Sequence, residues 1–268
     1  MMGYPRRRFL VASSGIAVAA SLLAFRANSA VLSGRQAINK SGQLRMLSQR
    51  VLKAYAQVGL GLTPNESTNL LNRSISMANG NMVALRAEAA SDPLKASFTK
   101  VEKTWAALRD MASTTPNQTN ARQIAKLGDE MLVEADKLTG IFESAVGTNT
   151  AMVINLAGRQ RMLSQKMARH YFFNVWGVAE KADKLAFDKA RADFSSAIDT
   201  LTAFPQNSRD IDSRLVMLKN QWTFMSTAFS VDKGNAYNPV DARHVATTSE
   251  NMLDIADELT TLYENLKG

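Results

Sequence analysis

The sequence of 268 residues contains no cysteine, and this absence excludes disulfide bonds, thiolate metal sites and cysteine nucleophiles. Histidine occurs only twice, as His170 and His244, and no carboxylate cluster accompanies either residue in the sequence. We therefore expect no metal site. The chain also lacks a nucleophile–base pairing, a glycine-rich phosphate loop and a dinucleotide-binding pattern. We therefore expect a protein that is not an enzyme and that needs no cofactor.

Aromatic residues are scarce at 7%, and there are only 14 glycines and 6 prolines, whereas 46% of the residues are hydrophobic. A chain of this length and hydrophobic content can bury one substantial core or two similar cores. The formal net charge is +8, but residues 1–30 contain four arginines and no acid, so +4 remains without them. So small an excess does not indicate nucleic-acid binding and is compatible with a small anionic ligand.

Residues 1–30 have the features of an export signal. Arg6-Arg7-Arg8-Phe9-Leu10 resembles the twin-arginine signature, and an alanine-rich apolar run and small residues follow it. The apolar run covers 17 residues (9–25), which is at the short end for a membrane-spanning helix. We expect a periplasmic protein whose signal peptide is cleaved near residue 30. An uncleaved N-terminal membrane anchor is the alternative.

Beyond residue 30 the pattern is helical almost throughout, and no alternating β-branched run of strand length occurs. Prolines that follow a capping residue mark helix starts at Thr63-Pro64, Asp92-Pro93, Thr115-Pro116 and Asn238-Pro239. These marks predict eight helices, over residues 32–60, 65–90, 93–113, 117–146, 150–179, 182–203, 208–230 and 240–267. The predicted fold class is all-α.

The second half of the chain repeats the first. The residues Ile, Asn and Gly and the run Arg-Met-Leu-Ser-Gln of segment 37–59 recur in segment 153–177 at an offset of 116. Segment 121–143 recurs at 242–264 at an offset of 121. A repeat of this length indicates two structural units. We predict two tandem antiparallel four-helix bundles, formed by residues 31–148 and 149–268. The joint near Gly147 leaves open whether the units fold back on each other or continue end to end.

Within the repeated motif, residues spaced by 4, 3 and 4 positions share one helix face. They are Ile38, Gly42, Arg45 and Gln49 in the first copy, and Ile154, Gly158, Arg161 and Gln165 in the second. A glycine costs a helix interior about 1 kcal/mol relative to alanine, which suggests close approach of a backbone or a ligand. The neighbouring arginine offers planar donors suited to an oxyanion. Alternatively, the glycine lets two helices touch and the arginine forms a salt bridge.

The predicted bundle core lies on roughly the opposite face of the first motif helix. Its residues are Leu44, Leu47, Val51, Ala54 and Val58. A run of acids in the fourth predicted helix is interpreted as a solvated face that balances nearby lysines. Its members are Asp129, Glu130, Glu134 and Asp136.

The motif INKSGQLRMLSQR, residues 38–50, resembles the periplasmic P-box of nitrate sensor kinases of the NarX type. It is also similar to the N-terminal domain of type IV pilus chemotaxis transducers of the PilJ type. In the sensor kinases, two motif helices meet across a homodimer axis and their arginines hold one nitrate. The resemblance implies Arg45 and Arg161 as the anion-binding arginines. It places the motif glycine at Gly42 and Gly158 and the motif lysine at Lys40.

The second copy departs from the motif, because Leu156 replaces the lysine. Gln36 and Met152 occupy the position at which the family has a histidine. The later basic position of the motif falls on Arg50 and Lys166.

The resemblance implies an exported sensory module that binds a small oxyanion, nitrate or nitrite, and feeds signal transduction. The candidate ligand-binding residues are Lys40, Gly42, Gly158, Arg45, Arg161, Ile38, Ile154, Gln49 and Gln165. The alternative is a non-enzymatic interaction protein, which pairs its bundle with a membrane-bound sensor kinase or a pilus chemotaxis transducer. Self-association through the motif helices is a further expectation.

Overall fold

The computed structural model describes residues 32–230 and 237–266, which belong to one compact unit of residues 31–268. The export signal expected in residues 1–30 lies outside this described part. The described residues form helices and no strand, which confirms the all-α prediction. The helices are α1 (Gly34–Gly59), α2 (Pro64–Arg86), α3 (Asp92–Ala112), α4 (Gln118–Val146), α5 (Asn149–Val175), α6 (Lys181–Thr202), α7 (Arg209–Ser230) and α8 (Pro239–Glu264). None of these described helices is long and apolar enough to cross a membrane.

Local capping explains where the motif helices begin. At the start of α1, the Ser33 side chain accepts a hydrogen bond from Gln36 N, and the Gln36 side chain accepts one from Ser33 N. Helix α4 ends at Gly147, whose φ of +64° lies in the left-handed region that favours glycine. The Thr148 side chain then caps α5 by accepting from Ala151 N. Because only residues 147 and 148 separate α4 from α5, the chain folds back at once.

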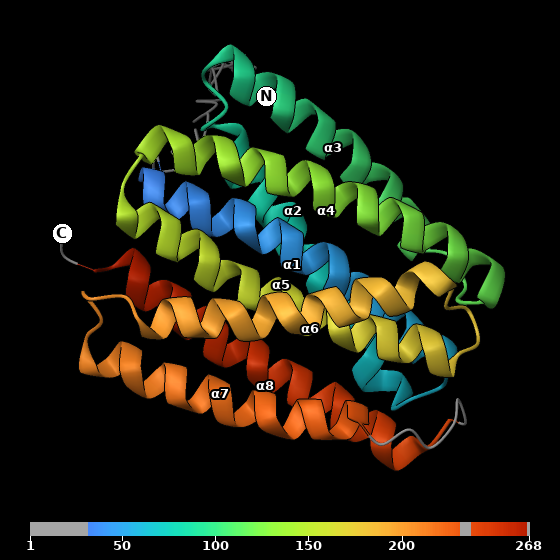
Figure 1. Cartoon of the computed structure of the whole chain (residues 1–268). Coiled ribbons are helices and arrows are strands. Elements are labelled where there is room, and N and C mark those ends of the chain that lie inside the picture. The colour runs from blue at the N-terminus through green and yellow to red at the C-terminus, as the bar shows by residue number, and fades with distance from the viewer. Residues whose placement is uncertain (1–31, 231–236, 267–268) are drawn as a thin grey trace, which may run out of the picture. The chain divides into compact units, whose positions relative to one another are not determined.

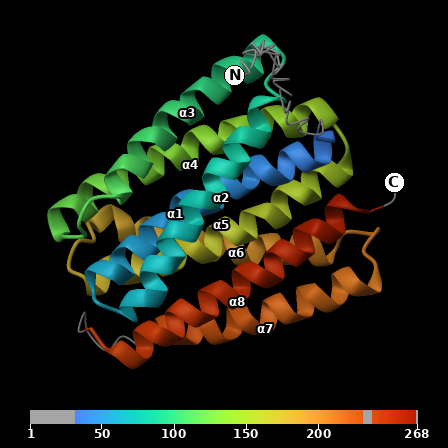
Figure 2. The same ribbon diagram turned by 180° about the vertical axis from the view of Figure 1, so that it is seen from behind.

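The two motif helices, α1 and α5, pack against each other (Figures 1 and 2). Helix α1 also packs against α2 and α4, and α5 against α6 and α8; the outer α3 and α7 pack on α4 and α8. Contacts between α1 and α5 follow the same order along both helices: Arg161 with Asn39, Arg169 with Gln49, and Trp176 with Gly59. The motif helices are therefore parallel, in register, and related by a pseudo-two-fold axis. This answers the question that the sequence left open.

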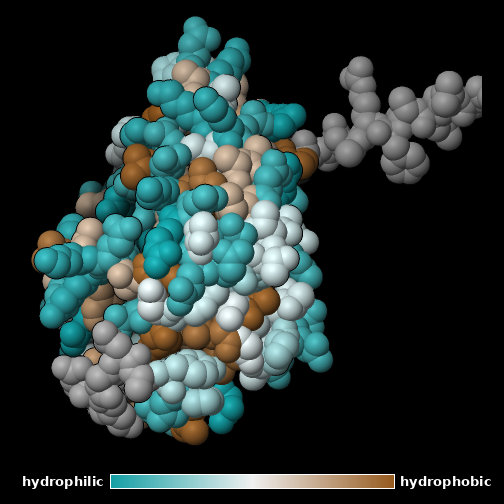
Figure 3. Space-filling model, turned by 90° about the vertical axis from the view of Figure 1, so that its right-hand side faces the viewer, coloured by the Kyte–Doolittle hydropathy of each residue, from teal (hydrophilic) through white to brown (hydrophobic). Residues whose placement is uncertain are grey.

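Helix α1 is buried on more than one face because α2, α4 and α5 surround it. Four of the five predicted core residues, Leu44, Leu47, Val51 and Ala54, are fully buried, whereas Val58 is half-buried. Polar side chains of α1 are buried as well, namely Ser41, Arg45, Ser48, Gln49, Lys53 and Gln57. These buried polar residues give the protein a polar interior between the two repeats. The surface is polar as well: Figure 3 shows that hydrophilic residues cover most of the face seen from the right-hand side of Figure 1, with hydrophobic residues in small patches.

Candidate functional site

The two motif arginines face the same small space between α1 and α5. Arg45 is 1% exposed and Arg161 is fully buried. A Cβ atom built on Gly42 would lie 3.1 Å from Nη2 of Arg45 and 3.6 Å from Nη2 of Arg161. A Cβ atom on Gly158 would lie 3.1 Å from Nη2 of Arg161 and 3.7 Å from Nη2 of Arg45. Both glycines therefore make room for the two guanidinium groups.

Each motif arginine forms an ion pair with the fourth helix of its own repeat. Arg45 Nη1 lies 2.6 Å from Asp136 Oδ1 in α4, and Arg161 Nη1 pairs with Asp257 Oδ1 in α8. The two aspartates occupy equivalent repeat positions, and their side chains are 43% and 48% exposed. The salt-bridge alternative considered for Arg45 is thus present in the structure. The interpretation of the acidic run as a solvated face is wrong for Asp136, because its carboxylate forms an ion pair with the buried Arg45.

The second terminal nitrogen of each arginine crosses to the other repeat. Arg45 Nη2 donates to Asn155 Oδ1 at 2.6 Å, and Arg161 Nη2 donates to the backbone oxygen of Asn39 at 3.3 Å. The Nε atoms of Arg45 and Arg161, like that of Arg169, are buried and have no hydrogen-bond acceptor among the described residues. The motif arginines therefore keep donor capacity that the surrounding side chains leave unused.

Burial governs the charge state of this site. Burial lowers the pKa of Arg45 to about 10, Asp136 opposes this shift, and the cations Arg159 and Arg161 add to it. Burial lowers the pKa of Arg161 as well, against the influence of Asp257. A pKa of about 10 leaves Arg45 protonated at neutral pH. Two positive groups therefore face each other in a medium that screens their repulsion poorly.

The other candidate residues hold the helices around the arginines. Ile38 and Ile154 are each 1% exposed and belong to the hydrophobic core. The motif glutamines donate to backbone oxygens of the fourth helices: Gln49 to Gly128 at 3.4 Å and Gln165 to Ser249 at 2.8 Å. Lys40 is half-buried on α1 and forms no ion pair within the described part of the chain.

A second buried polar layer follows the arginines along α1 and α5. Lys53 is fully buried, donates to Ser249 Oγ at 3.0 Å and pairs with Glu250, both in α8. At the equivalent position of α5, Arg169 pairs with Asp129 of α4 at 2.6 Å. These pairs cross between repeats, whereas those of Arg45 and Arg161 remain within one repeat.

Our reading of the sequence missed this second layer. A signal for it was present, because positions 53 and 169 are both basic at the repeat offset of 116. It also corrects the interpretation of Asp129, which pairs with a buried arginine and is not simply part of a solvated face.

The described histidines and acids were also compared with the pattern of a metal site. No group of three or more potential metal-ligating residues occurs in the part of the chain that the structure describes. His170 Nδ1 lies 2.9 Å from Asp183 Oδ1. Burial lowers the pKa of His170 from 6.5 despite Asp183, which favours the neutral imidazole at neutral pH.

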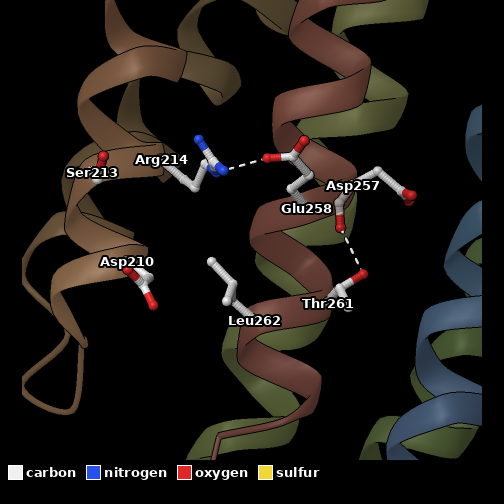
Figure 4. A pocket seen from close by; sticks show the side chains of 7 residues that line it. All are labelled: Asp210, Ser213, Arg214, Asp257, Glu258, Thr261 and Leu262. Atoms are coloured by element: carbon white, nitrogen blue, oxygen red, sulfur yellow. Dashed lines mark hydrogen bonds and ion pairs between the residues drawn. The ribbon is translucent and has the colours of Figure 1, made fainter.

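A hollow of about 550 Å³ lies between α7 and α8 (Figure 4). Arg214 and Glu258 form an ion pair of 2.6 Å across it. Asp257 also lines the hollow, but its side chain points away from α7, towards the side on which α1 lies. Asp257 therefore borders the hollow, but its carboxylate, which pairs with Arg161, is directed away from it.

Comparison with known proteins identifies the repeat. The profile of the family described as type IV pili methyl-accepting chemotaxis transducer N-term, or PilJ, matches twice, over residues 27–129 and 144–236. No curated protein and no solved structure matches the chain significantly. The two family matches cover more than half of the sequence, and each includes one of the parallel motif helices. The chain therefore belongs to the PilJ family of chemotaxis-transducer N-terminal domains, as a tandem duplication.

Proposed function

We propose that this protein is a periplasmic sensory module that binds a small oxyanion, nitrate or nitrite, between Arg45 and Arg161. The observation that carries the proposal is the meeting of two buried guanidinium groups beside Gly42 and Gly158. An anion in this space would accept hydrogen bonds from both repeats and offset the repulsion between the arginines. The resemblance to the nitrate-sensor P-box suggests the same class of ligand.

Arg45 and Arg161 can donate hydrogen bonds to an anion and still keep part of their hydrogen bonding to the protein. Asp136 and Asp257 are close to half exposed, so water can solvate these carboxylates if an anion takes part of the arginine hydrogen bonding. Both arginines also retain a buried Nε donor without an acceptor in the described residues. Planar guanidinium groups suit a planar oxyanion because two parallel N–H groups can bind two oxygens.

The interaction-protein alternative gains less support from the arrangement of the helices. The motif faces of α1 and α5 are buried against each other, so an outside bundle has no access to them. Self-association through the same faces is disfavoured for the same reason. We propose that a membrane-bound transducer, if it receives the signal, contacts other helices of this module. Export remains an expectation based on residues 1–30.

Isothermal titration of the mature protein with nitrate, nitrite and sulfate tests the proposal. We expect nitrate or nitrite to bind one site per chain. We expect the double variant Arg45→Gln, Arg161→Gln to bind at least about 100-fold more weakly, because each lost charged hydrogen bond costs about 1.5–3 kcal/mol and tenfold in affinity corresponds to about 1.4 kcal/mol.

A second variant separates binding from folding in this experiment. In Gly158→Ala both arginines remain, but the new methyl group would lie 3.1 Å from Nη2 of Arg161 and displace it by a few tenths of an ångström. We expect this variant to remain folded and to lose about tenfold in affinity, which corresponds to about 1.4 kcal/mol. Gly80→Ala is the control, since a Cβ there meets nothing within 4 Å. Absence of binding of all three anions to folded wild-type protein would refute the proposal.

A further inference from the structure

The two halves of the motif site differ in charge at the residue after each glycine. This residue is Gln43 in α1 and Arg159 in α5. Both side chains reach across to the fourth helix of the other repeat and contact the aspartate that pairs with a motif arginine. Arg159 Nη2 lies 3.1 Å from Asp136 Oδ1 and 3.3 Å from Oδ2. Gln43 Nε2 lies 3.5 Å from Asp257 Oδ1. The two contacts are equivalent in position, but only one carries a charge.

This difference makes the Arg45 side of the site the more positive one. Asp136 is shared between two cations, Arg45 and Arg159. Asp257 accepts from one cation, Arg161, and from the neutral Gln43.

The next acidic residues occupy equivalent positions on the two sides, and the influence of Glu264 on Arg161 adds to this asymmetry. Glu143 accepts from Asn155, and Glu264 accepts from Asn39. Arg159 is therefore the source of the charge difference among these paired contacts.

We infer that the oxyanion binds off-centre, closer to Arg45 than to Arg161, and that Arg159 is the positioning residue that causes this. The half-exposed Arg159 balances part of the negative charge of Asp136, so that Asp136 offsets less of the positive charge of Arg45. Arg45 therefore attracts the anion more strongly. On the other side, Arg161 is the cation that pairs with Asp257, so the ion pair between Asp257 and Arg161 is stronger than the one between Asp136 and Arg45. This inference rests on the proposed function, because it concerns the same site.

Exchanging the residues of the two repeats tests the inference. Each substitution introduces the side chain that the other repeat already has at that position, and Arg159 is 44% exposed, so the fold should tolerate the change. We expect Arg159→Gln to weaken nitrate binding by about five- to tenfold, measured by isothermal titration. We expect the double variant Gln43→Arg, Arg159→Gln to recover affinity to within about twofold, because it moves the extra charge to the Arg161 side. A purely structural role of Arg159 predicts no such recovery.

The single arginine variants provide the second readout. We expect Arg45→Gln to lose more affinity than Arg161→Gln in the wild-type background, and the order to reverse in the exchanged double variant. Urea unfolding of each variant checks that the protein titrated is folded. Equal losses for the two arginines, or unchanged affinity in Arg159→Gln, would overturn the off-centre site while leaving the oxyanion site intact. Absence of oxyanion binding to the wild type would instead remove the proposed function, and this inference with it.

Discussion

Replacing Glu250 by leucine is expected to lower the free energy of unfolding by about 3 kcal/mol, because it leaves Lys53 buried without its charged partner. Lys53 is fully buried, and its ammonium group donates hydrogen bonds to Ser249 Oγ and Glu250. Burial lowers the pKa of Lys53, and Glu250 opposes that shift. Urea unfolding at pH 7, followed by circular dichroism, measures the change.

Two further variants serve as controls for Glu250→Leu. The double variant Lys53→Met, Glu250→Leu is expected to recover most of the lost stability, since an apolar pair of similar size needs no desolvation of charge. Asp193→Asn removes the exposed ion pair with Lys189 and is expected to cost less than about 0.5 kcal/mol. If Glu250→Leu lowered the free energy of unfolding by no more than Asp193→Asn does, the stability of the fold would not depend on the ion pair between Lys53 and Glu250.

The same carboxylate predicts a specific dependence of stability on pH. Burial alone would raise the pKa of Glu250, but Lys53 and Arg50 outweigh burial and lower it from 4.5 to about 2. A lowered pKa means that the ionised form stabilises the fold above pH 4.5, and that this contribution is lost as the pH falls towards 2. We therefore expect the stability of the wild type, relative to the double variant Lys53→Met, Glu250→Leu, to be constant from pH 7 to 5 and to decline below pH 4.5. Unfolding curves at several pH values measure this difference, and a relative stability of the wild type that rises in acid would contradict the assignment.

Gly128→Ala is expected to lower the free energy of unfolding by about 1–2 kcal/mol, because α1 and α4 leave no room for a methyl group. A Cβ atom on Gly128 would lie 2.1 Å from Cδ1 and 3.1 Å from Cγ of Leu52, which is fully buried. Thermal or urea unfolding measures the loss.

Gly140→Ala in the same helix is the matched control for Gly128→Ala. A Cβ atom on Gly140 meets nothing within 4 Å, so the better helix propensity of alanine should raise stability by about 0.5–1 kcal/mol. Equal effects of the two substitutions would show that the contact of Gly128 with Leu52 relaxes at no cost.

Much of the fold could be predicted from the sequence because helix starts depend on local chemistry. Pro64, Pro93 and Pro239 lie in the first turn of their helices, close to the predicted starts. The start of α4 differs from the other three. Its cap is Asn117, which follows Pro116, so α4 begins two residues after the proline.

The composition of the interior could not be predicted in the same way. Periodicity gave α1 a single core face, because a bundle helix normally buries one stripe. Periodicity does not show that α5 covers the opposite face. The burial of Lys53 by the second repeat was therefore not predicted.

The arrangement of residues at the candidate site could be predicted only in part, for a related reason. The repeated Gly-Arg pair led to Gly42, Arg45, Gly158 and Arg161, and the structure brings these four residues together. The acidic partners of the two arginines, Asp136 and Asp257, lie far from them in the sequence and are half-exposed. The sequence pattern around these aspartates is therefore that of exposed residues. The role of Asp136 depends on which helix lies beside α1, and helical periodicity does not contain that information.

The short connection at Gly147 and Thr148 has a consequence for how the paired motif helices behave on dilution. When two half-sites belong to separate subunits, the site disassembles once the concentration falls below the dissociation constant of the dimer. Here a two-residue turn joins α4 to α5, so each repeat encounters the other at an effective concentration in the millimolar range or above. The pairing of Arg45 with Arg161 is thus independent of how many copies a cell contains, and a single isolated molecule carries the whole site.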